Sequence, residues 1–299
     1  MLPAAPLQLP RLVVNADDYG YFAAVTRGVL ETLDAGSVTA TGVLANGPAL
    51  PRYAEALRDR PGVDVGVHLN LTLGEPLTAG LRGRLGASGG RFAGRAGLLA
   101  ALATGRFPLA EVVAELRAQV ERCLALGLAP RFLNGHEHVH MLPGILPRVG
   151  ALAAEYGIPH VRFVTPEWRA GGLAPGPLAR SAVLQVLALL QRGSRPRGGP
   201  TLLGAGVSGR LTRAALAARL AHLAPGRDYE LMCHPGYRDP EEVRDPALLA
   251  FHGWDEEREL LTGPGLRTLC LARGVRLVRF RDLEDGPGRS REDPIGRTP

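Results

Sequence analysis

The sequence predicts an α/β fold in which a parallel sheet curls into a (β/α) barrel. Short apolar segments rich in β-branched residues alternate with longer segments whose apolar residues recur at helical spacing. This alternation is typical of a parallel sheet with helical crossovers. About seven or eight strand–helix units in roughly 280 residues fit a closed or slightly irregular barrel, and an open doubly wound sheet is the alternative.

The first half of the chain has clear helix boundaries. An apolar strand is expected at residues 12–15 and a helix at 22–35, ended by Gly36. A β-branched strand at 39–44 precedes a helix at 50–60, which Pro61 and Gly62 stop. The next expected elements are a strand at 63–69, a helix at 109–126 ending at Gly127, a strand at 131–134, and a helix at 143–156 that begins with proline.

The second half continues the pattern less regularly. Strands are expected at 160–164, 229–233 and 275–280, and helices at 178–191, 214–223 and 256–272. Two stretches, near 73–107 and 170–209, are rich in glycine and arginine and interrupt the alternation. Long insertions of this kind usually shape a substrate cleft. We expect one catalytic domain over residues 1–285, and a Gly/Pro/Arg-rich flexible tail over 286–299.

Composition excludes several classes of protein. All 35 basic residues are arginine, so lysine Schiff-base chemistry is excluded. The net charge is +6, but the arginines are scattered and aromatic residues make up 5%, so we expect no nucleic-acid partner. Cys123, Cys233 and Cys270 form no C-x-x-C pair and suit reduced thiols. Because no signal peptide or membrane span is evident, we expect a cytoplasmic protein.

Asp17 and Asp18 directly follow the first apolar strand and precede Gly20. In a (β/α) barrel, residues at the carboxyl ends of the strands form the catalytic rim. Where the strand bends into a loop, both carboxylates can reach one cleft, so that one binds a metal while the other acts as a base. The alternative is a pair of aspartates that caps the next helix.

His68 and Asn70 alternate with apolar residues at the end of another expected strand. Both can therefore face the same side, although a lone histidine is often structural. A denser cluster follows the strand at 131–134, where His136, His138 and His140 fall within one short segment. All three share a face in extended geometry, whereas in a helix only His136 and His140 do. Metal binding together with Asp18 and His68 is favoured over a solvated histidine-rich loop.

His234 ends a later strand and is followed by Pro235 and Gly236, which form a rigid turn. The imidazole is a candidate general acid or substrate contact, and a structural role at the strand end is the alternative. Arg162, in the strand at 160–164, is a candidate for reaching the cleft. An ion pair at the strand end is its alternative role.

Four segments in this order resemble the YdjC-type carbohydrate deacetylases. They are Asn-Ala-Asp-Asp-Tyr-Gly from residue 15, Gly-Val-His-Leu-Asn-Leu-Thr from 66, Asn-Gly-His-Glu-His-Val-His-Met-Leu-Pro from 134, and Cys-His-Pro-Gly-Tyr from 233. The resemblance runs from about Arg11 to Leu283. Two departures from the family pattern are Tyr21-Phe22 and the Gly/Arg-rich residues 82–95.

The resemblance implies a deacetylase barrel that removes the N-acetyl group from amino sugars or chitooligosaccharides, and a homodimer. By motif position, Asp18, His68 and His136 are the metal ligands and Asp17 is the base. The resemblance implies one divalent ion, commonly magnesium, whereas two imidazole ligands favour zinc on affinity grounds.

The expected reaction is hydrolysis by a metal-activated water with Asp17 as general base. His234, or else His138 or His140, would protonate the leaving amine. Asn70, His138, His140 and Arg162 are candidate substrate contacts. Competing functions are deacetylation of a lipid-linked, hopanoid-type amino sugar, phosphoester hydrolysis, and sugar binding without catalysis.

Overall fold

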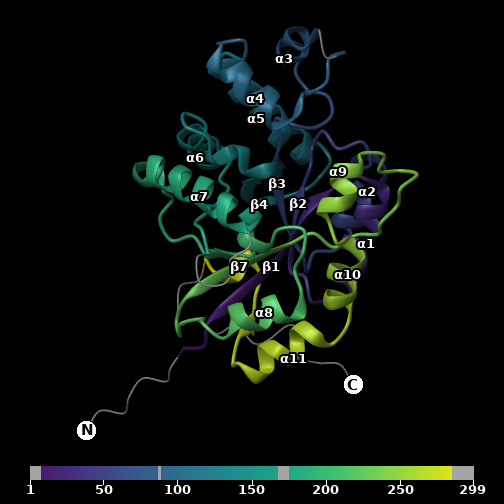
Figure 1. Ribbon diagram of the computed structural model, residues 1–299, viewed down its shortest axis with the longest axis vertical. Helices are drawn as coiled ribbons and strands as arrows, with labels where there is room; N and C mark the ends of the chain where they lie inside the picture. The colour runs from purple at the N-terminus through teal and green to yellow at the C-terminus, as the bar shows by residue number, and fades with distance from the viewer. Residues whose placement is uncertain (1–7, 87–88, 168–174, 285–299) are drawn as a thin grey trace.

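Eight strands form one parallel sheet within residues 8–86, 89–167 and 175–284, which are the parts of the chain that the computed structural model describes (Figure 1). Their order is β5-β4-β3-β2-β1-β7-β6, and β8 pairs with the start of β1. The strands are β1 (Arg11–Tyr19), β2 (Ala40–Val43), β3 (Asp64–Leu69), β4 (Pro130–Gly135), β5 (His160–Val161), β6 (Thr201–Leu203), β7 (Asp228–Cys233) and β8 (Arg276–Leu277). In these residues no strand pairing joins β5 to β6, so the barrel remains open between them.

The predicted (β/α) barrel is confirmed in its irregular form. Each expected strand is present, although the strands expected at 160–164 and 275–280 shorten to two residues each. β1 continues past its expected end to Tyr19, because its second half pairs with β2. β6 was not predicted, because three residues after a Gly/Pro/Arg-rich stretch show no recognisable alternation.

Eleven α-helices in the described residues surround the sheet. They are α1 (Ala23–Asp34), α2 (Leu50–Arg58), α3 (Ala79–Arg84), α4 (Gly94–Ala103), α5 (Leu109–Ala125), α6 (Leu146–Glu155), α7 (Pro175–Leu190), α8 (Arg213–Leu220), α9 (Pro246–Phe251), α10 (Trp254–Thr262) and α11 (Gly265–Ala272). The helix expected at 256–272 is two helices, because Gly263 and Pro264 interrupt it. The stretch at 73–107 contains α3 and α4, at the top of Figure 1, and α7 lies within 170–209. The expected tail at 286–299 falls outside the described residues.

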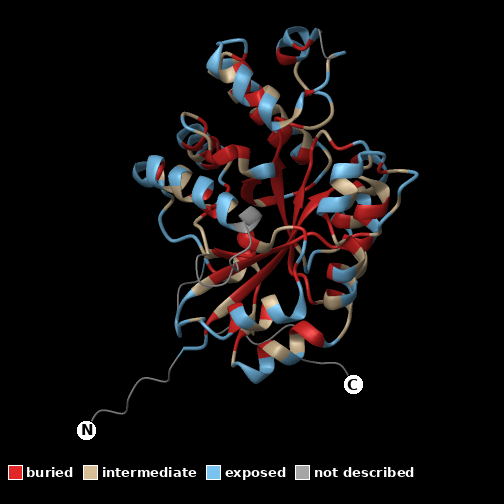
Figure 2. Ribbon diagram, viewed as in Figure 1, coloured by how far each residue is buried: buried red, intermediate tan, exposed pale blue. Residues whose placement is uncertain are grey.

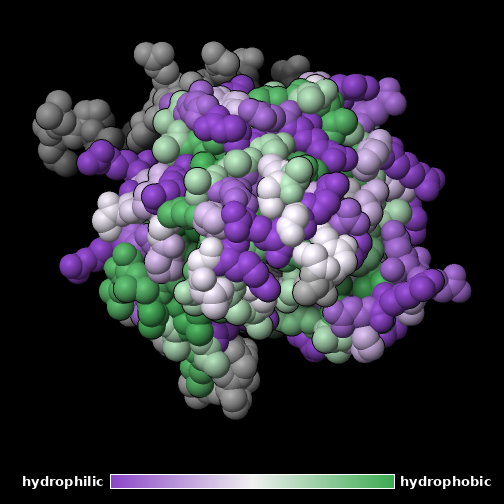
Figure 3. Space-filling view, turned by 90° about the horizontal axis from the view of Figure 1, so that it is seen from above, coloured by the Kyte–Doolittle hydropathy of each residue, from purple (hydrophilic) through white to green (hydrophobic). Residues whose placement is uncertain are grey.

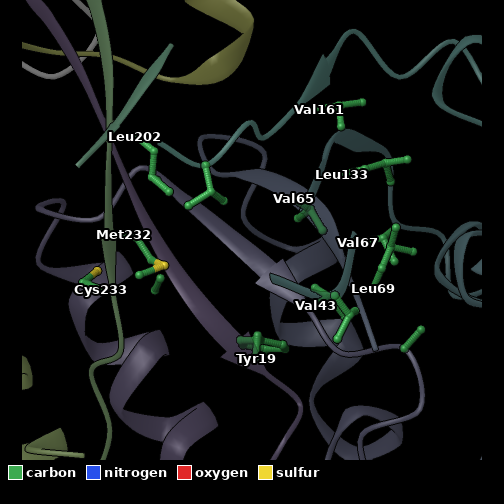
Figure 4. Packing of buried hydrophobic residues seen from close by; sticks show 14 of the residues in the cluster. Tyr19, Val43, Val65, Val67, Leu69, Leu133, Val161, Leu202, Met232 and Cys233 are labelled. Atoms are coloured by element: carbon green, nitrogen blue, oxygen red, sulfur yellow. The ribbon is translucent and has the colours of Figure 1, made fainter. Parts of the chain in front are cut away.

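Most of the sheet is buried, and exposed residues gather on the outer helices (Figure 2). All six residues of β3 are buried, as are all residues of β1 after Arg11. Burial on both faces explains the apolar run at residues 12–14 of β1 and the apolar residues of β3. Figure 4 shows Tyr19, Val43, Val67 and Leu133, from four strands, in one buried cluster. No helix in the described residues is both long enough and apolar enough to span a membrane.

Helix α1 approaches the turn after β7 so closely that two glycines meet. A Cβ atom added to Gly28 would lie 2.4 Å from the Cα of Gly236. One added to Gly236 would lie 2.9 Å from the Trp254 ring. Because Gly236 follows His234 and Pro235, the packing of α1 fixes the position of the turn that carries His234.

We predict that Gly28→Ala lowers the free energy of unfolding by about 1–3 kcal/mol, the usual cost of overpacking a buried contact. The result is informative because alanine in a helix normally stabilises relative to glycine. Urea unfolding measures the change, and Gly62→Ala is the control, since its added methyl group meets nothing within 4 Å. A Gly28→Ala protein as stable as the wild type would contradict the described contact.

Candidate metal centre and active site

Asp17 and Asp18 face one cavity because the end of β1 is irregular. The pairing of β1 with β2 shifts between Ala16 and Tyr19, and Asp18 has a φ of 69°. A regular strand would send neighbouring side chains to opposite faces, whereas a bulge re-aims one of them. Both aspartates line the cavity. Helix α1 begins after Phe22, and the N–H groups of Ala23 and Ala24 in its first turn donate to the carboxylate of Glu242, so neither aspartate is seen to cap this helix.

Asp18, His68 and His136 bring three potential metal ligands together. Their ligand atoms all lie within 4.8 Å of one another, and all three residues are buried. Oδ1 of Asp18 is 2.8 Å from Nδ1 of His136 and 3.2 Å from Nε2 of His68. Two imidazole nitrogens and one carboxylate oxygen form a donor set that suits a catalytic divalent ion, with further coordination positions left for water or substrate. The residues present therefore fit the metal that the sequence predicts.

Asn134, at the end of β4, orients His68 for such a role. Its amide Nδ2 donates to Oδ1 of Asp17 at 2.8 Å, which fixes the orientation of the amide. Its Oδ1 must then accept from Nδ1 of His68, also at 2.8 Å. With the proton on Nδ1, the lone pair of Nε2 faces Asp18. Partners of this kind fix the tautomer of a metal-binding histidine.

The histidine-rich segment is neither extended nor a regular helix. It forms the 3₁₀ segment η2 (His136–Met141), within which Glu137 and His138 have φ values of 50° and 59°. This strained turn separates the three imidazoles. His136 faces Asp18 and His138 lines the cavity, whereas Nε2 of His140 donates to the carbonyl oxygen of Arg162 at 3.0 Å.

A buried ion network holds Asp17. Nη1 and Nη2 of Arg162 donate to its two carboxylate oxygens at 2.6 and 3.0 Å. Asn15 and Asn134 each donate to its Oδ1. The same guanidinium donates to Oε1 of Glu230, at 3.0 Å from Nε and 2.6 Å from Nη2. One arginine thus bridges two carboxylates, on β1 and β7.

These contacts set the ionisation of the site. Burial alone would raise the pKa of Asp17, but the charge of Arg162 and, to a lesser extent, of His68 hold it well below its usual range. The pKa of Asp18 is likewise lowered, because His136 and His68 outweigh the effect of burial. Burial and then the charge of Arg162 lower the pKa of His140 to about 3. Asp17 is therefore ionised and His140 neutral near pH 7.

A cavity of about 370 Å³ opens over these residues. His234 lies on its wall, with its backbone N–H donating to Oε2 of Glu257 at 2.6 Å. Its Nδ1 is buried without a hydrogen-bond partner in the described structure. The ring of His234 lies 5.2 Å from that of His252, which stacks on Trp254 at 4.8 Å. The cavity is lined by Asp17, Asp18, His68, Arg95, Gly135, His136, Glu137, His138, Ser208, Met232, His234, Asp245, Ala247, Leu248, Phe251 and His252.

Three residues expected to contact substrate lie elsewhere. Asn70 donates to Asn46 and accepts from backbone N–H groups of the following turn. His140 and Arg162 lie behind the cavity wall, in the hydrogen bonds given above. None of the three lines the described cavity, so their contacts support the site instead of facing substrate. For Arg162, the ion pair considered as its alternative role is what the structure shows.

Several site residues were not identified from the sequence. Asn134 and Glu230 lie within or beside the quoted segments, but only the curled sheet shows that they touch His68 and Arg162. His252 and Asp245 lie in no recognisable motif, and they reach the cavity from the region around α9. Their distance from His234 along the sequence did not indicate that they lie in the same cavity, because a long loop separates them from His234.

Comparisons with known proteins identify the family of this chain. The model of the family described as YdjC-like protein matches residues 11–272. A carbohydrate deacetylase of Geobacillus stearothermophilus is 31% identical over 92% of this chain and 99% of its own length. A chitooligosaccharide deacetylase of Klebsiella pneumoniae (strain 342) is 34% identical over 91% and 98%.

A solved structure shares the fold. It is a protein of Enterococcus faecalis for which cleavage of cellobiose phosphate has been suggested. It aligns with a TM-score of 0.69 at 24% identity, over 92% of this chain and 99% of its own. From the match of the family model and of these full-length relatives, the chain belongs to the YdjC-like family.

Proposed function

We propose that this protein hydrolyses the N-acetyl group of an acetylated amino sugar or chitooligosaccharide and releases acetate. The observation that carries the proposal is the convergence of a buried Asp18, His68 and His136 triad with ionised Asp17 and with His234 around one cavity. The names of the relatives, carbohydrate deacetylase and chitooligosaccharide deacetylase, support the same reaction. Three buried free cysteines, Cys123, Cys233 and Cys270, fit the cytoplasmic location that we also propose.

Asp18, His68 and His136 would hold one divalent ion. Such an ion supplies an acidified water and polarises the acetyl carbonyl. The family resemblance favours Mg²⁺, whereas the two imidazole donors favour Zn²⁺. We propose Mg²⁺ with Zn²⁺ as the alternative, and elemental analysis of the purified protein decides between them.

Asp17 acts as the general base in this proposal. Arg162, Asn15 and Asn134 hold its carboxylate in one orientation and keep it ionised. The same contacts make it a weak base, so it suits a water that is already acidified better than an ordinary one. Orientation, more than basicity, is the contribution that this network makes.

His234 acts as the general acid toward the leaving amine. It lines the cavity with Asp17, and its ring has no hydrogen bond from Nδ1 that would hold it in another role. Of the two alternatives considered from the sequence, His140 lies outside the cavity wall and bonds to the backbone of Arg162, whereas His138 lines the cavity but has a pKa that burial lowers well below its usual range. His252 does line the cavity, but burial lowers its pKa to about 3, so it lacks the proton that an acid must give.

Phosphoester hydrolysis is the competing reaction. Enzymes of that class commonly pair two metal ions about 4 Å apart through several carboxylates. In the described residues one group of three potential ligands is present, and it contains a single carboxylate. Amide hydrolysis at a single ion is therefore the better fit.

We predict that His68→Ala sharply lowers metal occupancy per chain. It removes one of three ligands and leaves Oδ1 of Asn134 without its hydrogen-bond donor, while Nδ2 of Asn134 still donates to Asp17. Elemental analysis after dialysis measures the change, and His222→Ala, at an exposed position in the turn after α8, is the control. Wild-type stoichiometry and affinity in His68→Ala would refute the ligand assignment.

We predict that the wild type releases acetate from N-acetylated amino sugars and that Asp17→Asn keeps the metal but loses turnover by about 10²–10⁴-fold, the usual contribution of a general base. Acetate release from a panel of acetylated sugars measures both. Asp228→Asn is the control, because Asp228 also pairs with an arginine but lies at the start of β7, at the opposite end of the sheet. Normal turnover in Asp17→Asn would exclude it as the base.

We predict that His234→Ala affects substrates according to their leaving group. Amide hydrolysis should slow by about 10²–10⁴-fold, since the amine must be protonated to leave. An aryl acetate should be hydrolysed at nearly the wild-type rate, because a phenolate leaves without a proton. If both substrates slow equally while the metal content is unchanged, His234 is not the acid.

A further inference from the structure

An apolar groove leads out of the catalytic cavity between helices α4 and α7. It has a volume of about 200 Å³. Its apolar lining includes Leu98 and Leu99 of α4, Val139 of η2, and Val183, Leu184 and Leu187 of α7. No phenylalanine, tyrosine or tryptophan side chain belongs to its described lining. The groove plays no part in the metal chemistry described above.

The groove and the cavity are continuous. Arg95, Glu137, His138 and Ser208 line both of them. Nε of Arg95 lies 3.1 Å from a carboxylate oxygen of Glu137, so an ion pair marks the junction. A molecule that places one end at Asp18 and His136 can therefore extend its other end past His138 into the groove.

The lining of the groove is suited to hydrocarbon. Leu98, Val139 and Leu184 are at most 5% exposed, so they contribute buried apolar surface to its lining. Leu99 and Val183 are 52% and 60% exposed, so apolar surface remains for a ligand to cover. A sugar unit needs hydrogen-bonding partners or an aromatic platform, and beyond the junction Arg180 is the polar residue that the lining offers. A hydrocarbon chain needs neither, and its burial is favourable.

We propose that the groove binds a hydrocarbon chain attached to the anomeric oxygen of the N-acetylated amino sugar, so that the substrate is an amphipathic glycoside. This inference rests on the proposed function, because it places the acetamido group at the metal site. The chain must then be attached elsewhere on the sugar, and the anomeric oxygen is where amino sugars carry an aglycone. The polar cavity holds the sugar and the apolar groove holds the chain.

Another apolar surface lies next to the groove and provides an internal control. Val186, Leu189 and Leu190 of α7 are 55–64% exposed and do not line the groove. Figure 3 shows an apolar patch at its lower left, on the side where Figure 1 places α7. A second copy of the chain or a membrane surface would contact this outer face, whereas a substrate chain enters the groove.

The test compares the kcat/KM for acetate release from methyl, butyl, hexyl and octyl glycosides of N-acetylglucosamine, below micelle-forming concentrations. We expect kcat/KM to rise by up to about fourfold per buried methylene and then to level off when the groove is filled. The paired variant Leu99→Ser with Val183→Ser should reduce the octyl-to-methyl ratio to near one while leaving the methyl glycoside rate unchanged. The matched control is Val186→Ser with Leu189→Ser, which should keep the wild-type ratio.

A flat dependence on chain length in the wild type would overturn the proposal. So would a control pair that lowers the ratio as much as the groove pair does, because the chain would then bind the outer face of α7. If no glycoside yields acetate, the proposed function fails. Calorimetric titration of the metal-loaded protein with the octyl glycoside then tests separately whether the groove binds the hydrocarbon chain. Binding that is lost in the groove pair alone supports the groove, and absence of binding overturns it.

Discussion

The buried contact of Arg162 with Asp17 and Glu230 is the interaction on which the site depends. Arg162 follows β5 at one edge of the sheet, whereas its partners lie on β1 and β7, several strands away. The guanidinium can reach them only because the sheet curls. It therefore links, through the interior of the barrel, two parts of the sheet that no strand pairing connects directly. Removing one member of a buried ion pair typically costs about 3–5 kcal/mol, because the other charge is left uncompensated. The curvature of the sheet therefore brings Arg162 to Asp17 and keeps Asp17 ionised, and the resulting ion pair stabilises the curvature.

The metal ligands are placed by a second set of constraints that connects to the first. Asn134 touches both Asp17 and His68, so the base and one ligand share a hydrogen-bonded partner. Asp18, Glu137 and His138 all have positive φ values, which are uncommon for residues other than glycine. Such strain, typically about 1–3 kcal/mol per residue, persists only where surrounding contacts enforce it. This strain is concentrated at the ends of β1 and β4, where local stability is lower and the backbone is held in the geometry that the site requires.

Much of this could be predicted from sequence, for a physical reason. In a parallel sheet all carboxyl ends meet at one rim, so polar residues that follow apolar strands, such as Asp18, His68 and His136, can be grouped without knowing the packing. The contacts of Asn134 and Glu230 could not be predicted, because they depend on the curvature of the sheet. The position of His252 at the cavity could not be predicted either, because it depends on a loop without a repeating sequence pattern. The positive φ values of η2 explain why neither an extended nor a helical geometry described His138 and His140 correctly.

The division between a polar cavity and an apolar groove has a structural origin. The cavity is built largely from strand ends held by the ion network, whereas the groove is built from α4 and α7, which lie in the two stretches that interrupt the strand–helix alternation. Segments of this kind can change without disturbing a rigid scaffold, and they commonly determine what a site accepts. The family resemblance rests on the strand-end segments, so it carries information about the reaction and little about the rest of the substrate. Information about the rest of the substrate lies in the leucines and valines of α4 and α7, because covering their exposed apolar side chains is energetically favourable.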